Sequence, residues 1–242
     1  MFISDDESLN KSEFVVSTTI ENGLNYSRSI VEINHSELGF HNLDHNNDTR
    51  VFALKMIYQA MSSGNINNED GQLLLLAVGF HDVVQGNGPI VNERMSADIA
   101  RKWMEENKEY TEENIALVEK IIMGTAIERG DDGKMHQLAE HVATGNPNTD
   151  LLIKMMADID LFNIGATEDI FENRSLGLWN EMSGTAYIKV DDMDIDEQRK
   201  FWTFEHDFLE GRNYLTNNAR QLSPNIENNQ ILVNQKIANL TV

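Results

Sequence analysis

Cysteine is absent from this chain of 242 residues, and its absence excludes three kinds of site. Without cysteine there is no disulfide framework, no cysteine-based zinc site and no thiol nucleophile. Such a composition fits a reducing compartment. The first residues, 1–8, are acidic and lack both the basic start and the apolar core of a signal peptide. We therefore expect a cytoplasmic protein.

Long apolar runs are missing as well. The longest strongly apolar stretch covers residues 73–80, which is far too short to cross a bilayer, because a transmembrane helix needs about 20 apolar residues. The sequence therefore predicts no membrane partner.

Basic residues are scarce, with 19 Lys+Arg against 40 Asp+Glu and a formal net charge of −21. A field of this sign repels phosphate backbones, so we expect no extended nucleic acid as a partner. A small phosphorylated substrate is still compatible with it, because a bound cation can dominate the local field in a site. The oligomeric state stays open at this point.

Only three prolines interrupt the chain, and most of its length shows helical periodicity. Residues 69–84 are apolar on nearly every side, which indicates a buried helix with His81 and Asp82 in its last turn. The other expected helices are 48–62, 92–106, 112–123, a helix capped by Thr149 or Asp150 that runs to 162, 167–183, 194–219 and 227–240. Residues 128–148 are expected to form a loop with at most one short helix, and β-alternation is confined to residues 186–190. The predicted fold class is all-α.

The length suits one domain, or one domain with a C-terminal elaboration. We expect a flexible N-terminal segment over residues 1–20, one helical domain over residues 21–220 and a C-terminal helical extension over residues 221–242. With 40% apolar residues, the chain can bury a substantial core.

Three separated fragments carry side chains that bind divalent metal ions. His41 and His45 are four positions apart, so on a helix they share one face. His81 and Asp82 are adjacent and close an otherwise apolar helix, where polar side chains are costly unless they have partners. An imidazole nitrogen beside a carboxylate oxygen suits Mn, Fe, Zn or Mg. An acid far downstream would complete the set of ligands.

Two acids compete for this downstream position, Asp158 and Asp160. Helical periodicity does not choose between them, because each one aligns with a stripe of apolar residues. The alternative reading of Asp158 is a local ion pair with Lys154, one helical turn before it.

Together these fragments resemble the HD superfamily of metal-dependent phosphohydrolases, and most closely its small bacterial members. The resemblance implies an all-α HD-domain bundle and a site for a divalent ion, which would be Mn, Mg, Fe, Co or Zn. It assigns this ion to His45, His81, Asp82 and Asp158. The Met-Ala-Asp motif that ends at Asp158 is similar to the Ala-Asp motif that carries the family's final ligand. Asp160 is then left with a supporting role.

The resemblance also implies residues that act on the substrate. The His-Asn-x-x-His element is similar to that of the class I cyclic-nucleotide phosphodiesterases, so His41 would donate a proton to the leaving oxygen, with a carboxylate such as Asp44 favouring its protonation. The stretch from Asn92 is similar to the Asn-Glu-x-x-Ser-Ala of the small bacterial proteins. There Glu93 would orient a metal-bound water and Arg94 would contact phosphate. The same residues also suit the polar first turn of a helix.

Two positions depart from the family patterns. The phosphodiesterases carry a second histidine three residues after the His-Asp doublet, where this chain has Gln85, and the bacterial proteins carry one near the position of Ile127. His136 and His141 lie further on in loop-like sequence and would substitute only if that loop folds over the site. These departures leave the first metal position intact and argue against a second ion held wholly by the protein.

The function implied by the resemblance is hydrolysis of a small phosphate ester, such as a nucleotide or cyclic nucleotide, by a metal-activated water. Three alternatives stay open: a nucleotide-sensing HD module without turnover, an HD-type di-iron oxygenase, and another enzyme of this fold such as a lyase or a deoxynucleotide hydrolase. The oxygenase needs extra histidines for a second iron, which the departures at Gln85 and Ile127 disfavour.

Overall fold

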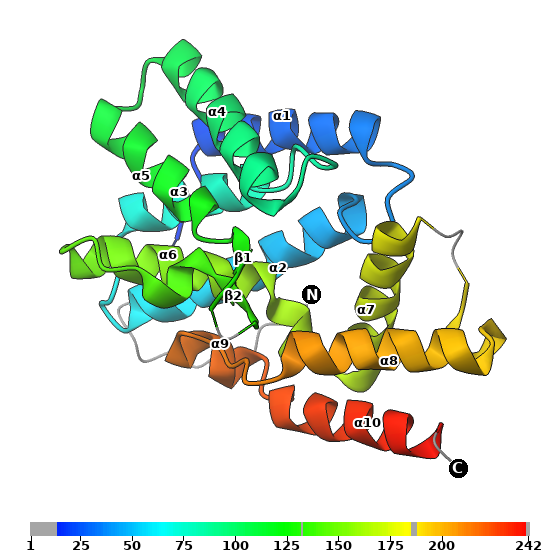
Figure 1. Ribbon diagram of the computed structural model, residues 1–242. Coiled ribbons are helices and arrows are strands. Elements are labelled where there is room, and N and C mark those ends of the chain that lie inside the picture. Colours follow the sequence, from blue (N-terminus) through cyan, green and yellow to red (C-terminus); the bar gives the residue numbers. More distant parts are fainter. Residues whose placement is uncertain (1–13, 132, 185–187, 241–242) are drawn as a thin grey trace.

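The computed structural model describes residues 14–131, 133–184 and 188–240 (Figure 1). Within these residues the chain forms ten α-helices and one small two-stranded sheet, so the all-α fold class is confirmed. The first half contains α1 (Thr18–Asn34), α2 (Leu43–Ser62), α3 (Asn68–Phe80), α4 (Pro89–Asn107) and α5 (Glu112–Met123). The second half contains the antiparallel strands β1 (Ile127–Arg129) and β2 (Met135–Gln137), then α6 (Pro147–Asp160), α7 (Glu168–Ser183), α8 (Ile195–Leu209), α9 (Asn217–Leu222) and α10 (Ile226–Asn239).

Helix α3 is the centre of the bundle, because α1, α2, α4, α5 and α6 all pack against it. Its residues 73–78 are all buried, as expected for a helix that is apolar all round. The helix starts with a capping box, in which the side chains of Asn67 and Asp70 each accept a hydrogen bond from the other's backbone N–H. No helix among the described residues, α3 included, is both long enough and apolar enough to span a bilayer.

The predicted helices differ from the observed ones mainly at their ends. The buried helix expected over residues 69–84 ends at Phe80, so the His-Asp doublet follows it. Helix α6 starts earlier than predicted, because Asn146 caps it instead of Thr149 or Asp150 and Pro147 takes the first helical position.

The remaining differences concern one predicted helix, one predicted loop and one helix that the sequence did not predict. The helix expected over residues 194–219 is divided into α8 and α9 by a turn at Gly211, where φ is 76°. The segment expected to be a loop contains the hairpin β1–β2 and a 3₁₀ helix (Leu138–His141). Helix α1 was not predicted.

Some expectations fall partly outside the described residues. Most of the segment expected to be flexible, residues 1–20, lies outside them, and α1 already begins at Thr18. The strand-like segment 186–190 is described only at its end, which enters a 3₁₀ turn (Val190–Asp192). Helix α10 packs against α8 (Figure 1), and the expected boundary at residue 220 falls within α9. The division into domains stays a prediction.

Helices α2, α3 and α6 meet in pairs in the middle of the fold. The start of α2, the residues that follow α3 and the end of α6 carry the histidines and acids that the sequence singles out. Packing of these three helices therefore decides which of those side chains come together.

Candidate metal centre

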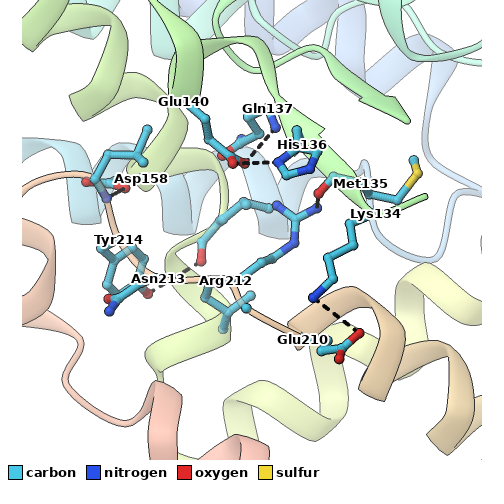
Figure 2. A pocket seen from close by; sticks show the side chains of 14 residues that line it. Lys134, Met135, His136, Gln137, Glu140, Asp158, Glu210, Arg212, Asn213 and Tyr214 are labelled. Carbon is cyan, nitrogen blue, oxygen red and sulfur yellow. Dashed lines mark hydrogen bonds and ion pairs between the residues drawn. The ribbon is translucent and has the colours of Figure 1, made fainter. Parts of the chain in front are cut away.

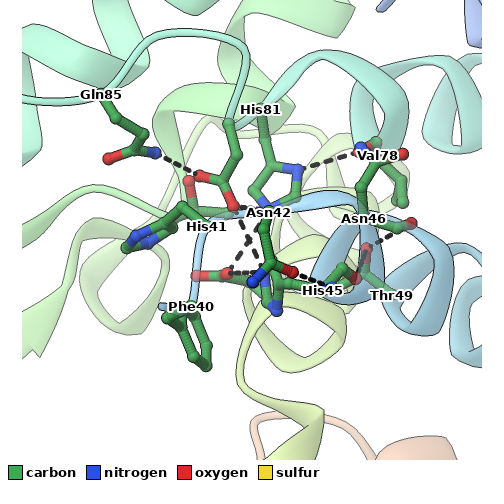
Figure 3. A network of polar contacts seen from close by, with 12 residues as sticks. Phe40, His41, Asn42, His45, Asn46, Thr49, Val78, His81 and Gln85 are labelled. Carbon is green, nitrogen blue, oxygen red and sulfur yellow. Dashed lines mark hydrogen bonds and ion pairs between the residues drawn. The ribbon is translucent and has the colours of Figure 1, made fainter. Parts of the chain in front are cut away.

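Four side chains from these segments converge on one point. His45, His81, Asp82 and Asp160 each offer a ligand atom, and these atoms all lie within 4.8 Å of one another. The Nε2 atoms of His45 and His81 lie 3.2 and 2.9 Å from Asp82 Oδ2. The same nitrogens lie 3.7 and 3.5 Å from Asp160 Oδ1. Figure 3 shows the two imidazoles side by side, with their ring centroids 5.9 Å apart. The structure thus brings together the predicted His45, His81 and Asp82.

The atoms that converge are buried and lack hydrogen-bond partners. This holds for Nε2 of His45, Nε2 of His81 and Oδ2 of Asp82. They approach one another closely, but not with the geometry of hydrogen bonds. Buried polar atoms without partners are costly and rare in folded proteins. A divalent cation between them would satisfy all three, and this mixture of nitrogen and oxygen donors suits Mn, Fe, Co or Zn. The cluster can therefore hold a metal ion.

Neighbouring groups orient the ligands. His81 Nδ1 lies 2.9 Å from the carbonyl oxygen of Val78, to which it donates its proton, and this leaves the lone pair on Nε2 facing the cluster. The side-chain amide of Gln85 donates to Asp82 Oδ1 (3.1 Å) and accepts from Asn92 (3.1 Å). Gln85, which departs from the phosphodiesterase pattern, therefore holds Asp82 with its other oxygen toward the histidines.

The charged groups of the cluster shift one another's pKa values. Burial lowers the pKa of His81, but the carboxylates of Asp82 and Asp160 outweigh it and raise this pKa well above its ordinary value. Burial raises the pKa of Asp82, but the neighbouring histidines hold it well below its ordinary value. Since a metal must replace the imidazole proton, we expect metal binding to release protons and to weaken at low pH.

Asp158, to which the resemblance assigned the last ligand position, does not lie with the other three side chains, and Asp160 takes this place in the cluster. Asp158 is buried and accepts hydrogen bonds from the backbone N–H groups of Leu215 (2.7 Å) and Thr216 (2.8 Å) and from the Thr216 hydroxyl (2.6 Å). Positions two apart on an α-helix lie about 200° apart, so Asp158 faces the start of α9 while Asp160 faces α2 and α3. Burial raises the pKa of Asp158 to about 6, against these hydrogen bonds.

His41 lies beside the cluster and outside it. Helix α2 begins only at Leu43, because the side chain of Asn42 caps it by accepting from the N–H groups of Asp44 (2.9 Å) and His45 (3.3 Å). His41 therefore precedes the helix. The four-residue spacing predicted that His41 and His45 share one helical face, and the structure does not show this. The two rings are still close, with centroids 6.0 Å apart.

Glu181 on α7 is the carboxylate that meets His41. Its Oε1 lies 2.6 Å from His41 Nδ1, and its Oε2 accepts from the N–H groups of Phe40 and His41, both at 3.0 Å. Burial lowers the pKa of His41, but Asp82 and Glu181 outweigh it and raise this pKa above its ordinary value. Asp44, which was expected in this role, is exposed.

A contact between two glycines positions this pair. A Cβ added at Gly39 would lie 2.4 Å from the carbonyl oxygen of Gly177, and one added at Gly177 would lie 2.5 Å from that of Gly39. Because neither residue has a side chain, the loop before α2 can pack directly on the backbone of α7. Glu181 follows Gly177 by about one helical turn and so reaches His41. Sequence reasoning missed Glu181, because no local pattern joins residues 140 positions apart.

Glu93 and Arg94 are the remaining predicted residues, and both lie on α4. Burial raises the pKa of Glu93 to about 8, and the negative charges of Asp82 and Asp160 add to this shift. Its Oε2 is buried without a hydrogen-bond partner. Arg94 is exposed. The roles of Glu93 toward water and of Arg94 toward phosphate stay predictions.

His136 and His141 do not join the cluster and instead form a separate group with Glu140. Their segment nevertheless packs on α6 through Gln137, whose amide donates to the Ala157 carbonyl (3.3 Å) and to Asp160 Oδ2 (3.4 Å). The loop therefore supports Asp160 without adding a histidine to the first metal position.

No protein-family model matches the sequence, and a search of curated proteins finds no match either. We therefore infer what the site can do from the residues that form it.

Proposed function

We propose that the protein is a metal-dependent phosphohydrolase that cleaves a small phosphate ester, in the manner of the HD superfamily its sequence resembles. The observation that carries the proposal is the set of buried ligand atoms without hydrogen-bond partners on His45, His81 and Asp82, completed by Asp160. A nucleotide or cyclic nucleotide as substrate and a cytoplasmic location belong to the same proposal.

One divalent ion would be held by these four residues. When bound, such an ion lowers the pKa of a water molecule and neutralises charge on phosphoryl oxygens. The protein contributes ligands whose directions are set before binding, since the Val78 carbonyl orients His81 and the amide of Gln85 orients Asp82. Burial of the ligands also strengthens the electrostatic interactions within the site.

His41 supplies the proton that the leaving oxygen requires. It lies outside the ligand group, and its Nδ1 is engaged by Glu181 at 2.6 Å, so its Nε2 is the atom that can transfer a proton. Its raised pKa favours the protonated form that a general acid needs. Glu181 holds the ring in place, because its second oxygen is anchored by two backbone N–H groups.

A nucleotide-sensing module without turnover is the second candidate. It is favoured by Gln85, which occupies the position of a further histidine in the phosphodiesterases and here only supports Asp82. Among the described residues the cluster thus offers ligands for one ion. A di-iron oxygenase would need a second set of ligands beside the first, so we do not favour it.

The test is a hydrolysis assay without oxygen. Chelator-treated protein would be reloaded anaerobically with Mn²⁺, Mg²⁺ or Co²⁺ and offered mononucleotides, cyclic nucleotides and nitrophenyl phosphate. We expect metal-dependent hydrolysis that Asp82→Asn abolishes and that the matched Asp44→Asn, at an exposed acid of the same region, leaves unchanged. Bound metal and bound nucleotide without hydrolysis would favour the sensing module, and an obligatory need for iron and oxygen would overturn both.

A further inference from the structure

We propose a second metal site, for a transition-metal ion of the Zn²⁺ class, formed by His136, Glu140 and His141. Their ligand atoms lie within 4.8 Å of one another, and they form the only such group besides the central cluster in the part of the chain that the structure describes. The proposal does not depend on the hydrolase function, because it concerns different ligands.

The local backbone brings the three side chains together. His136 lies in β2, where it pairs with Glu128 of β1, and the 3₁₀ helix Leu138–His141 follows immediately. This tight turn returns Glu140 and His141 to the side of His136. The rings of His136 and His141 have centroids 5.6 Å apart.

Glu140 is held through both of its oxygens. Oε1 accepts from the backbone N–H of Gln137 at 2.9 Å, which caps the 3₁₀ helix, while Oε2 lies 2.8 Å from His136 Nδ1. One oxygen therefore fixes the turn and the other faces the imidazole. A metal ion would take the place of the proton between these two groups, as metals do when they bind histidine.

The donor set and its exposure both suit a Zn²⁺-class ion. Two imidazoles and one carboxylate form a three-residue zinc set that leaves a coordination position for water or another ligand. His136 and Glu140 are half-buried and His141 is exposed, so an ion can enter from solvent.

A cavity of about 400 Å³ adjoins the group and provides space for further ligands. Figure 2 shows His136, Glu140 and Arg212 in its wall. The guanidinium of Arg212 is anchored by the carbonyl oxygens of Phe208 (2.6 Å) and Met135 (3.0 Å). The positive charge of Arg212 favours water or a small anion as the additional ligand of an ion bound here.

The test must separate the two metal sites, because a change at one site can disturb the other. Gln137 follows His136 directly, and its side chain also contacts Asp160 of the central cluster. Asp82→Ala would remove the central site and serve as the background. In this variant we expect one equivalent of Co²⁺ to bind with a visible absorption band that Zn²⁺ abolishes by competition. Adding His136→Ala or His141→Ala should weaken Co²⁺ binding by at least ~10-fold.

His206→Ala is the matched control, because His206 is also a surface histidine beside a carboxylate, with Asp207 at 3.2 Å. It should leave Co²⁺ binding unchanged, and thermal unfolding would verify that every variant folds. The proposal is overturned if the Asp82→Ala protein binds no Co²⁺, or if binding persists undiminished without His136 and His141. Neither result would bear on hydrolysis at the central cluster.

Discussion

Replacing Asp158 and Asp160 by alanine, one at a time, separates two roles that the sequence left open. Asp158→Ala removes the carboxylate that accepts from Leu215 N–H, Thr216 N–H and the Thr216 hydroxyl. Asp160→Ala removes a carboxylate that lies 3.7 and 3.5 Å from the two histidine nitrogens of the cluster. The first variant should lose stability, and the second should lose metal.

The magnitudes follow from these contacts. A buried group left without its hydrogen-bond partner costs about 1–3 kcal/mol. Thr216 is buried, whereas the half-buried Leu215 can regain water, so we expect Asp158→Ala to lose roughly 2–4 kcal/mol of unfolding free energy. For a chain of this size that corresponds to a fall of roughly 5–15 °C in Tm. Asp160→Ala should weaken metal binding by at least ~100-fold, because loss of even a residue that only orients a ligand costs 10–100-fold.

Thermal unfolding of the metal-free variants and calorimetric titration with Mn²⁺ or Co²⁺ would measure the two effects. Wild-type stoichiometry at the central site should persist in Asp158→Ala. The reasoning would be refuted if Asp158→Ala abolished metal binding with little change in Tm while Asp160→Ala bound metal as tightly as the wild type.

Two further predictions concern other side chains. His41→Ala should keep the metal and slow hydrolysis of alkyl phosphates by ~10²–10⁴-fold, with little effect on nitrophenyl phosphate, whose leaving group needs no proton; equal slowing on both would exclude the acid role. Glu205 on α8 is 1% exposed, and burial raises its pKa to about 7 against the hydrogen bond from Ser175 (2.8 Å). Because the folded pKa lies above the ordinary 4.5, this carboxyl costs stability progressively as pH rises from 4.5 to 7, on the order of 3 kcal/mol at ~1.4 kcal/mol per pH unit. Glu205→Gln should therefore raise Tm at pH 8 and leave it nearly unchanged at pH 4, and a pH-independent difference would contradict this account.

Local patterns sufficed to predict the buried helix and the residues at its end. A segment that is apolar on every side can only be stable in the middle of a bundle, and α3 lies there. His81 and Asp82 follow it directly, so the position of α3 also determines theirs. Their predicted association with His45 depended on the resemblance and on the packing of α2 against α3, which the structure provides.

The choice between Asp158 and Asp160 could not be made from local pattern. Both positions are on buried stripes of α6, and the difference lies in what packs against each stripe. Asp158 meets the N–H of Thr216, 58 positions further along the chain, and nothing near Asp158 in the sequence signals this partner. The Met-Ala-Asp motif favoured Asp158 as a ligand. The packing of α9 on α6 instead directs this side chain toward Thr216.

Gln85 and Glu181 were missed for different reasons. Gln85 was interpreted as a lost ligand, whereas its amide orients Asp82 through Oδ1. Glu181 reaches His41 only because Gly39 and Gly177 let two backbones touch, a contact that requires the assembled fold. Residues that support a site from distant elements leave no spacing that a single sequence can reveal.

The central claim is tested most directly by the metal content of His81→Ala and Asp82→Ala against the wild type. Each protein would be purified, loaded with Mn²⁺ or Co²⁺, freed of excess metal and analysed for bound ions per chain. The cluster geometry predicts that each variant carries one equivalent fewer than the wild type, because each change removes a ligand atom that converges on the same point. Unchanged metal content in both variants would show that His81 and Asp82 hold no ion, and the proposed site would be wrong.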